Sequence, residues 1–206
     1  MKGAKAMKNS VIIIGLACLM TITCGCGPKS VSSTGFLSDY SRLEPYSSTS
    51  LRYVDRGALG RYSSFIVDPV ASRVYGEARS KISAQDLQDI TNYMHSAIVR
   101  ELSDRYTIAY RPGPGVARIR VAITDLKKSN PVLNTIPQTK LAGVGLGGAS
   151  MEAEMIDSQT GRQIGAAVES QLGERLSLAG MTTWGDAKQV MDNWAKRLKT
   201  RLDEAH

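Results

Sequence analysis

Apolar residues at helical spacing mark two segments of the chain. Ser83 and Asp86 form an S-x-x-D capping pattern, and apolar residues then recur every three or four positions. A second stripe of this kind follows residues 183–186. The sequence predicts two long amphipathic helices with the buried positions Leu87, Ile90, Met94, Ala97, Ile98 and Leu102 in the first, and Ala187, Val190, Met191, Trp194, Leu198 and Leu202 in the second.

Other segments alternate between apolar and polar residues, which is the pattern of a half-buried strand. In residues 117–123, Arg118 and Arg120 share one side of such a strand. In residues 151–155, Glu152 and Glu154 do the same. A predicted hairpin and two shorter strands complete the set, with turn chemistry at 157–161, a return strand at 163–172, and short apolar runs at 64–70 and 106–111.

These elements predict an α+β fold in the order β-α-β-β-β-β-α. Amphipathic helices pack most readily on one face of a sheet whose other face is polar. We therefore expect two layers: a mostly antiparallel sheet of about five strands, with two long helices on one face. Arg118 and Arg120 are expected near Glu152 and Glu154 on the polar face, where such pairs contribute about 0.2–1 kcal/mol each.

The N-terminus has the three zones of a secretory signal. Lys2, Lys5 and Lys8 precede an apolar run at 11–22, and small residues follow it. The apolar run is shorter than the ~20 residues that a membrane-spanning helix needs. The sequence therefore predicts a signal peptide over residues 1–25.

The end of this segment resembles a bacterial lipoprotein signal, in which a small residue precedes an acylated cysteine. Cys26, with Gly25 before it, is the predicted lipid attachment site, and Cys24 is the second choice. The resemblance implies a diacylglyceryl group and an N-acyl chain such as palmitate, and more than one chain gives stable anchoring. Gly27 lacks the Asp that retains enterobacterial lipoproteins in the inner membrane, so the outer membrane is predicted. The alternative is an ordinary secreted protein whose Cys24 and Cys26 are inert or paired.

We predict three regions along the chain. Residues 1–25 are the signal peptide, residues 26–62 are a lipidated N-terminus, tether and extended arm, and residues 63–206 are a single α+β domain. The arm is polar and broken by Pro45 and by serines, although Phe36, Leu37, Tyr40 and Leu43 are enough to dock on a core. A partner-binding peptide is the alternative interpretation of the arm.

Composition narrows the possible functions. The 206 residues include 26 Lys and Arg against 19 Asp and Glu, a net charge of +7, and 42% are hydrophobic, as in an ordinary globular protein. Removal of residues 1–25 would take three lysines away and leave +4. The basic residues are scattered rather than interleaved with aromatic ones, so no nucleic-acid partner is predicted.

No motif predicts a reaction or a cofactor. Residues 143–148 match G-x-G-x-x-G, but a strand pattern follows them where a dinucleotide site needs a helix. His95 is the only histidine before the terminal His206, and it has no partner at metal-ligand spacing. No catalytic, cofactor-binding or metal-binding residue is therefore predicted. Some residues could take part in a site, but the sequence pairs none of them with a second functional group. They are the carboxylates Asp68, Asp125, Asp157 and Asp186, the aromatic residues Trp184 and Trp194, and the loop 127–137.

Several strings together resemble a family of bacterial outer-membrane lipoproteins of unknown function. The likeness covers about the whole mature chain, and it implies no reaction or catalytic residue. The strings are GFLSDYSRL (35–43), LRYVD (51–55), DPV (68–70), RPGPG (111–115), SNPVLN (129–134), EAEMIDSQTG (152–161) and WGDA with WA (184–187 and 194–195).

These observations predict a non-enzymatic binding or assembly module of the cell envelope. It would be lipid-anchored at the periplasmic side of the outer membrane and would bind an envelope protein or glycan. One alternative is a periplasmic hydrolase acting on glycan or peptide, which two close carboxylates in a pocket, or His95 against a serine, would favour. The other is an oligomerising component of an export or secretion assembly, which a symmetric interface through the arm or the glycine loop would favour.

Overall fold

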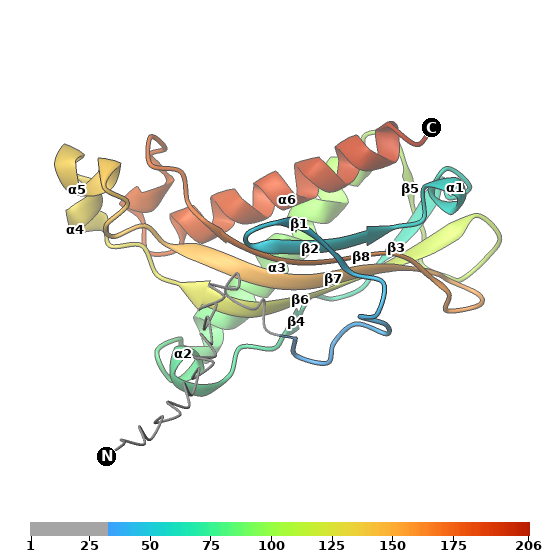
Figure 1. Cartoon of the computed structure of the whole chain (residues 1–206), viewed down its shortest axis with the longest axis horizontal. Coiled ribbons are helices and arrows are strands. Elements are labelled where there is room, and N and C mark those ends of the chain that lie inside the picture. Colours follow the sequence, from blue (N-terminus) through green and yellow to red (C-terminus); the bar gives the residue numbers. More distant parts are fainter. Residues whose placement is uncertain (1–32) are drawn as a thin grey trace, which may run out of the picture.

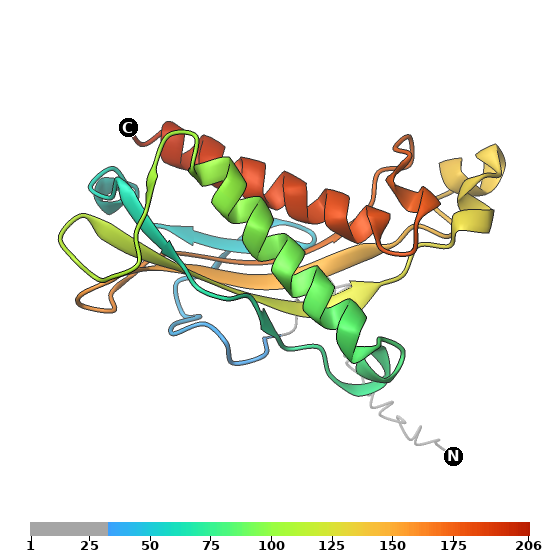
Figure 2. The same cartoon turned by 180° about the vertical axis from the view of Figure 1, so that it is seen from behind.

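Two helices of 19 residues cover one face of the sheet (Figure 2). The computed structural model describes residues 33–206. Ser83 caps α3 (Ala84–Leu102) by accepting a hydrogen bond from the backbone N–H of Asp86 at 3.0 Å. α6 (Gly185–Asp203) packs against α3, and both helices bury their apolar stripes in one core. Burial of these stripes against a sheet is the main source of helix stability here.

The sheet has eight strands of both orientations (Figure 1). Its strands follow the path β1-β2-β8-β7-β6-β3-β5, and β4 pairs with β6 off this path. Strands β1, β2, β8, β7 and β6 are antiparallel, whereas β3, β4 and β5 join by parallel pairing. The strands are β1 (Glu44–Ser47), β2 (Ser50–Val54), β3 (Ser64–Val67), β4 (Ala71–Ser72), β5 (Thr107–Ile108), β6 (Val116–Lys127), β7 (Gly148–Asp157) and β8 (Gln163–Leu172).

The α+β class agrees with the sequence, but the predicted layout is wrong. The sheet is mixed and has eight strands, not about five in a mostly antiparallel arrangement. Parallel pairing arises because α3 lies between β3 and β5 in the chain and returns it to the starting end of β3, so that β5 and then β6 run in the same direction as β3 on its two sides. Two further strands, β1 and β2, come from the segment that was expected to be an extended arm, and β2 pairs with β8 along its whole length.

The helices also outnumber the two predicted. Six α-helices and one 3-10 helix occur in residues 33–206. The additional ones have three to five residues, which is too short for an apolar period to appear in the sequence. They are α1 (Arg56–Leu59), α2 (Gly76–Ser80), α4 (Pro131–Asn134), α5 (Pro137–Leu141) and η1 (Ala179–Met181).

The sheet is covered differently on its two faces. The helix-side face carries the apolar residues of β6 and β7 and forms the large core with α3 and α6. The opposite face is crossed by residues 33–43, which are only part of the predicted extended arm; from here on, the arm means residues 33–43 (Figure 1). A small second core lies beneath the arm, where Leu37 packs on Ala166 and Val168 of β8.

The predicted grouping of four charged residues on one face is confirmed in part. Arg120 lies directly opposite Glu154 in the β6–β7 register and forms an ion pair with it. Arg118 pairs instead with Asp68, at 2.6 Å between Nη1 and Oδ1. The face is not a solvent-exposed one at β7, because the arm buries both Glu152 and Glu154.

Candidate functional site

Two carboxylates are buried between the sheet and the arm. The alternation of β7 places Glu152 and Glu154 side by side on the arm-side face, with exposed fractions of 0% and 2%. An ionised carboxylate is costly to remove from water unless charges or hydrogen-bond donors surround it. The partners of these two groups therefore decide what the site does.

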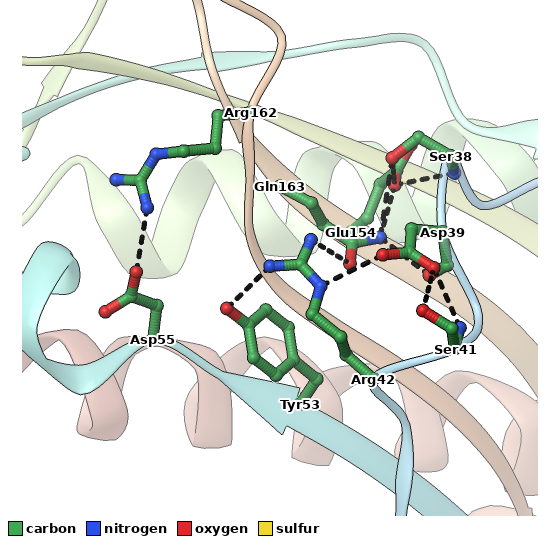
Figure 3. Close-up of polar contacts among 9 residues, drawn as sticks. All are labelled: Ser38, Asp39, Ser41, Arg42, Tyr53, Asp55, Glu154, Arg162 and Gln163. Carbon is green, nitrogen blue, oxygen red and sulfur yellow. Dashed lines mark hydrogen bonds and ion pairs between the residues drawn. The ribbon is translucent and has the colours of Figure 1, made fainter.

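Glu154 is surrounded by donors from three segments. Its Oε1 accepts from Nη1 of Arg120 on β6, and its Oε2 accepts from Nε2 of Gln163 on β8 at 2.9 Å. The arm adds two bonds to Oε2, from the backbone N–H of Ser38 at 2.9 Å and from its hydroxyl at 2.7 Å (Figure 3). This carboxylate thus joins the sheet to the arm through a charged pair and three neutral donors.

Glu152 depends on the arm alone. It accepts hydrogen bonds from the backbone N–H of Thr34, at 2.6 Å, and from the hydroxyl of Tyr40. Within residues 33–206, no Lys, Arg or His lies within ion-pair distance of it. We call Glu152, Glu154, Arg120 and Gln163 the carboxylate clamp. Within residues 33–206 the hydrogen-bond donors to Glu152 are neutral groups of the arm, so Glu152 would lose these bonds and become exposed to water if the arm moved away.

A turn in the arm reinforces the clamp. Asp39 accepts from the backbone N–H of Ser41 at 2.8 Å and from its hydroxyl at 2.7 Å, and these bonds lower the pKa of the Asp39 carboxyl. Arg42 pairs with Asp39 and donates to the hydroxyl of Tyr53 on β2 at 2.8 Å and to Oε1 of Gln163 at 3.2 Å (Figure 3). The arm is therefore fastened to β2, β7 and β8.

The far end of the β7–β8 hairpin is held by a separate set of carboxylates. Asp157 accepts from the backbone N–H and the hydroxyl of Thr160 in the turn, and these bonds, with that of Tyr62, lower its pKa to about 2. Asp55 pairs with Arg162 at 2.8 Å, which lowers the pKa of Asp55 (Figure 3). The contacts of Asp157 explain the turn chemistry at 157–161 as structural.

The opposite end of the sheet carries exposed apolar side chains. α4, α5 and residues 172–181 project there together (Figures 1 and 2). Asn134 joins them through Nδ2, which donates to the carbonyl of Gly180 at 2.8 Å, and Lys140 donates to the carbonyl of Ser177. We call this region the apolar end; its exposed residues are Val132, Ile136, Leu141, Val144, Leu172, Leu176, Leu178 and Met181.

The glycine motif at 143–148 makes close contacts with α4 and α6 at the apolar end. Gly145 has φ +85° and lies so close to Leu133 that a Cβ would meet it at 2.9 Å. The N–H of Gly147 donates to Oδ2 of the buried Asp186 at 2.8 Å, and the hydroxyl of Ser129 donates to the same oxygen at 2.9 Å. β7 follows the motif directly, so the strand–glycine loop–helix order of a dinucleotide site is not formed here.

The other candidates from the sequence lie apart from one another. Cys26 and Cys24 fall outside the described residues. His95 contacts the carbonyl of Val67 through Nε2 at 3.3 Å, and Trp194 is buried in the core. Among residues 33–206 there is no cluster of three or more potential metal ligands. No helix in that range has the length and apolarity needed to cross a membrane.

Sequence reasoning found the shared face of Glu152 and Glu154 but missed their burial and their partners. The Met-Glu-Ala-Glu-Met alternation was the available signal, and it assigns side chains to faces only. The donors from the arm lie 112 to 118 residues away in the chain. No local pattern reports contacts over such distances.

Comparison with known proteins gives one family match. The model of the family described as "Protein of unknown function (DUF3313)" matches residues 32–198. No curated protein matches the chain.

The solved structures that match this chain include those of three bacterial proteins. The dodecameric PelC from Paraburkholderia phytofirmans is 15% identical, with 75% of this chain and 96% of that chain covered and a TM-score of 0.47. Protein XCC0632 from Xanthomonas campestris is 12% identical, with 70% and 90% covered and a TM-score of 0.40. Lipoprotein GNA1162 from Neisseria meningitidis is 14% identical, with 69% and 99% covered and a TM-score of 0.34. At these scores the likenesses assign no function.

Proposed function

The chain belongs to the DUF3313 family of proteins of unknown function, and we propose that it is a lipid-anchored, non-enzymatic binding or assembly module of the bacterial cell envelope. In this proposal Cys26 is the acylated first residue of the mature protein, and the body lies on the periplasmic side of the outer membrane. The order of basic residues, apolar run and small residues before Cys26 supports the anchor.

The observation that carries the proposal is the attachment of the arm to the carboxylate clamp. The arm begins within eight residues of Cys26, so Thr34 lies at most about 27 Å along an extended chain from the lipid. Thr34, Ser38 and Tyr40 all donate to the clamp. The clamp would therefore hold the body close to the membrane surface by a defined part of its sheet.

The direction of the arm supports an orientation on the membrane. Thr34 contacts Glu152, which is nearer to the apolar end, and Ser38 contacts Glu154, which is farther along β7. Glu152 lies four residues from the start of β7 at Gly148, or about 13 Å. A lipid at Cys26 can thus reach the level of the apolar end.

The chemistry of the apolar end fits a bilayer surface. Leu176 and Leu178 have exposed fractions of 86% and 79%, which a soluble surface rarely gathers in one place. Lys140 and Arg175 lie among these apolar residues, and Lys127 and Lys128 precede them. Basic side chains beside apolar ones favour a membrane interface, because the apolar groups enter the boundary of the bilayer and the basic groups are attracted to anionic lipids. We propose that this end rests on the same bilayer that holds the acyl chains.

A hydrolase is the first alternative, and the two clamp carboxylates are its best candidates. Both glutamates are covered by the arm, and their oxygens accept from its backbone and hydroxyl groups. General acid or base catalysis needs a carboxylate within hydrogen-bond reach of a substrate. His95 contacts a backbone carbonyl and not a serine. These contacts support a structural role for the carboxylates, and turnover assays on peptidoglycan fragments and peptides test the hydrolase directly.

Assembly into an oligomer is the second alternative. It predicts that the extended segment 27–62 or the glycine loop 143–148 forms a symmetric interface between copies of the chain. Crosslinking in intact cells at single cysteines placed in the arm would detect such an interface. A ladder of covalent oligomers would favour the structural role over a monomeric binding module.

The anchor is tested by fractionation of matched cysteine variants in a Gram-negative host. Cys26→Ala is expected to leave the protein unprocessed or soluble in the periplasm, whereas Cys24→Ala is expected to keep it in the membrane fraction. A Cys26→Ala protein that is still matured and firmly bound to membranes would contradict the assignment. Loss of binding in Cys24→Ala alone would move the anchor to Cys24.

The choice of membrane has its own test. In an enterobacterial host, Gly27→Asp is expected to shift the protein from the outer-membrane to the inner-membrane fraction on a density gradient. Gly27→Ala is the matched control and should stay with the outer membrane. Wild-type protein found in the inner-membrane fraction would overturn the proposed location.

A further inference from the structure

A cavity of about 120 Å³ lies between the sheet and α6, on the face opposite to the arm. It exists because small residues occupy the helix-side row at this level. Ala153 on β7 pairs with Ala167 on β8, and Ala167 pairs with Arg52 on β2. Gly165 follows in the next row. α6 crosses this row with Trp194, Ala195 and Leu198, so the roof and floor of the cavity are apolar.

The mouth of the cavity is basic. Arg197 and Arg201 on α6, Arg52 on β2 and Glu169 on β8 all line the cavity, and Arg52 and Arg201 lie at its mouth because they also line the groove outside. Arg197 pairs with Glu169 at 2.6 Å between Nη2 and Oε1. Arg52 and Arg201 have no carboxylate within 4.0 Å among residues 33–206; instead their Cζ atoms lie 3.3 Å and 6.0 Å from the ring centroid of Tyr46. Two guanidinium groups around one ring leave an excess of positive charge at the entrance.

The environment of Arg201 compensates its charge only in part, because Glu169, which raises the pKa of Arg201, forms its ion pair with Arg197. Burial lowers the pKa of Arg201, and the neighbouring charge of Arg52 lowers it further. A bound anion would favour the charged form of Arg201, because an opposite charge nearby raises the pKa of a basic group. Arg52 and Arg201 also line a surface groove of about 580 Å³, whose other charged lining residues are Arg56, Glu44 and Glu204, so that three arginines face two carboxylates.

Trp194 is a second feature of the cavity, because it places in the lining a polar group that has no partner within residues 33–206. Its side chain is buried and lines the cavity, yet the indole Nε1–H has no hydrogen-bond acceptor. Buried tryptophan N–H groups usually have one. A space of this size is comparable to engineered apolar cavities of ~150 Å³ that take up a benzene molecule.

We propose that this cavity is a binding site for an anionic amphiphile. Its apolar segment, equivalent to four to six carbons or one aromatic ring, enters between Ala153 and α6, and its carboxylate or phosphate binds Arg52 and Arg201 at the mouth. The groove outside accommodates the rest of a longer molecule. This inference deepens the binding role proposed above, because it names the ligand class, but it does not depend on acylation of Cys26.

Fluorine NMR of the full mature chain tests the site, with hexanoate as the probe. The chain has two tryptophans, so 5-fluorotryptophan labelling gives one signal from Trp194 and an internal control from Trp184. The protein is purified from envelopes into nanodiscs of zwitterionic lipid, which avoids detergent in the cavity. Hexanoate should shift the Trp194 signal in a saturable way and leave that of Trp184 nearly unchanged.

Variants separate the two halves of the site. Ala153→Leu fills the cavity and should abolish the Trp194 response, whereas Arg201→Gln should weaken hexanoate binding about tenfold. Lys196→Gln removes the same charge from an exposed position of α6 and should change the affinity by less than about twofold. Hexan-1-ol, which lacks the anion, should bind about tenfold more weakly than hexanoate.

Three outcomes would overturn the inference. One is the absence of a saturable Trp194 shift in the wild-type chain. Another is an equal shift in folded Ala153→Leu protein, and the third is equal affinity for hexan-1-ol and hexanoate. Each of these leaves membrane anchoring untouched, because anchoring is measured by fractionation of the Cys26→Ala protein. If the wild-type chain were found in the soluble periplasmic fraction and still bound hexanoate, the anchor at Cys26 would be refuted and the binding site would not.

Discussion

The two faces of the sheet are buried by opposite means. On the helix-side face, α3 and α6 cover apolar side chains such as Ile123 and Met151 with other apolar side chains. On the arm-side face, a single extended segment covers Glu152 and Glu154 with hydroxyl and backbone donors. Both faces exclude water, but the first does so through many interchangeable contacts and the second through a few specific hydrogen bonds.

This difference predicts different responses to mutation. Hydrophobic burial is roughly proportional to area and is shared by many residues, so damage on the helix side should destabilise the whole domain. Hydrogen bonds to a buried carboxylate are directional, and a lost partner leaves a charge without compensation. Damage on the arm side should therefore release the arm while α3 and α6 stay folded.

The largest effect is expected on the helix-side face. Leu102 is fully buried at the end of α3, so Leu102→Ala should lower the free energy of unfolding by about 4 kcal/mol. Denaturant unfolding measures it, and hydrogen exchange should accelerate across the whole sheet. Leu178→Ala is the matched control at an exposed position and should change stability by less than about 0.5 kcal/mol. Exchange that accelerates only near Leu102 would contradict a single cooperative core.

Arg120→Met should have the next largest effect and tests the clamp. The substitution leaves the Glu154 carboxylate buried with neutral donors only. The free energy of unfolding, measured by denaturant unfolding, should therefore fall by about 3 kcal/mol. Arg118→Met is the matched control on the same face of β6. Its pair with Asp68 is partly exposed, with side-chain exposed fractions of 32% and 27%, so its loss should cost at most about 1 kcal/mol. Equal losses in the two variants would show that burial by the arm adds nothing to the Glu154 pair.

Tyr40→Phe should be milder and local. It removes one of the two described donors to Glu152, at an expected cost of about 1–3 kcal/mol. Hydrogen exchange should accelerate in residues 34–42 and stay unchanged in α3 and α6. Tyr53→Phe removes a hydroxyl that serves Arg42 and not a clamp carboxylate, so it is the control with a smaller expected effect. Unchanged exchange in the arm of Tyr40→Phe would refute the clamp as its main attachment.

The smallest expected effect is on the stability of the protein at acidic pH. The pKa of Asp157 is lowered to about 2, below its ordinary value of 3.8, so its contribution is present above about pH 4 and is lost as pH falls toward 2. Asp157→Asn should therefore be less stable at neutral pH and should show a shallower fall in stability between about pH 4 and 2. Asp125→Asn, at an exposed position, should leave that slope unchanged. A slope in Asp157→Asn equal to that of the wild-type chain would contradict the role of the turn.

The sequence predicted the elements whose patterns are long and regular. Ser83 and the stripe after it identified α3, the alternation at 117–123 identified β6, and the turn at 157–161 identified the β7–β8 hairpin. Elements whose sequences have no regular apolar period were not predicted. β1 and β2 contain Pro45 and two serines and become strands only because β8 offers an edge. α4 and α5 have four and five residues, so no apolar stripe can develop in them.

The candidate sites were predicted less well, because they are made by contacts between distant segments. The pattern of β7 assigned Glu152 and Glu154 to one face correctly, but it could not reveal that the arm covers them. The cavity arises from Ala153 and Ala167 lying opposite each other in the register, where alanine in a strand gives no local signal. Both features depend on strand register, which a single sequence does not determine across more than one hairpin.

The proposed anchor is tested most directly by the intact mass of the mature protein purified from envelopes. The account predicts a polypeptide that begins at Cys26 and carries the added mass of a diacylglyceryl group and one N-linked acyl chain. A chain that begins at any other residue, or one that begins at Cys26 without added mass, would contradict it.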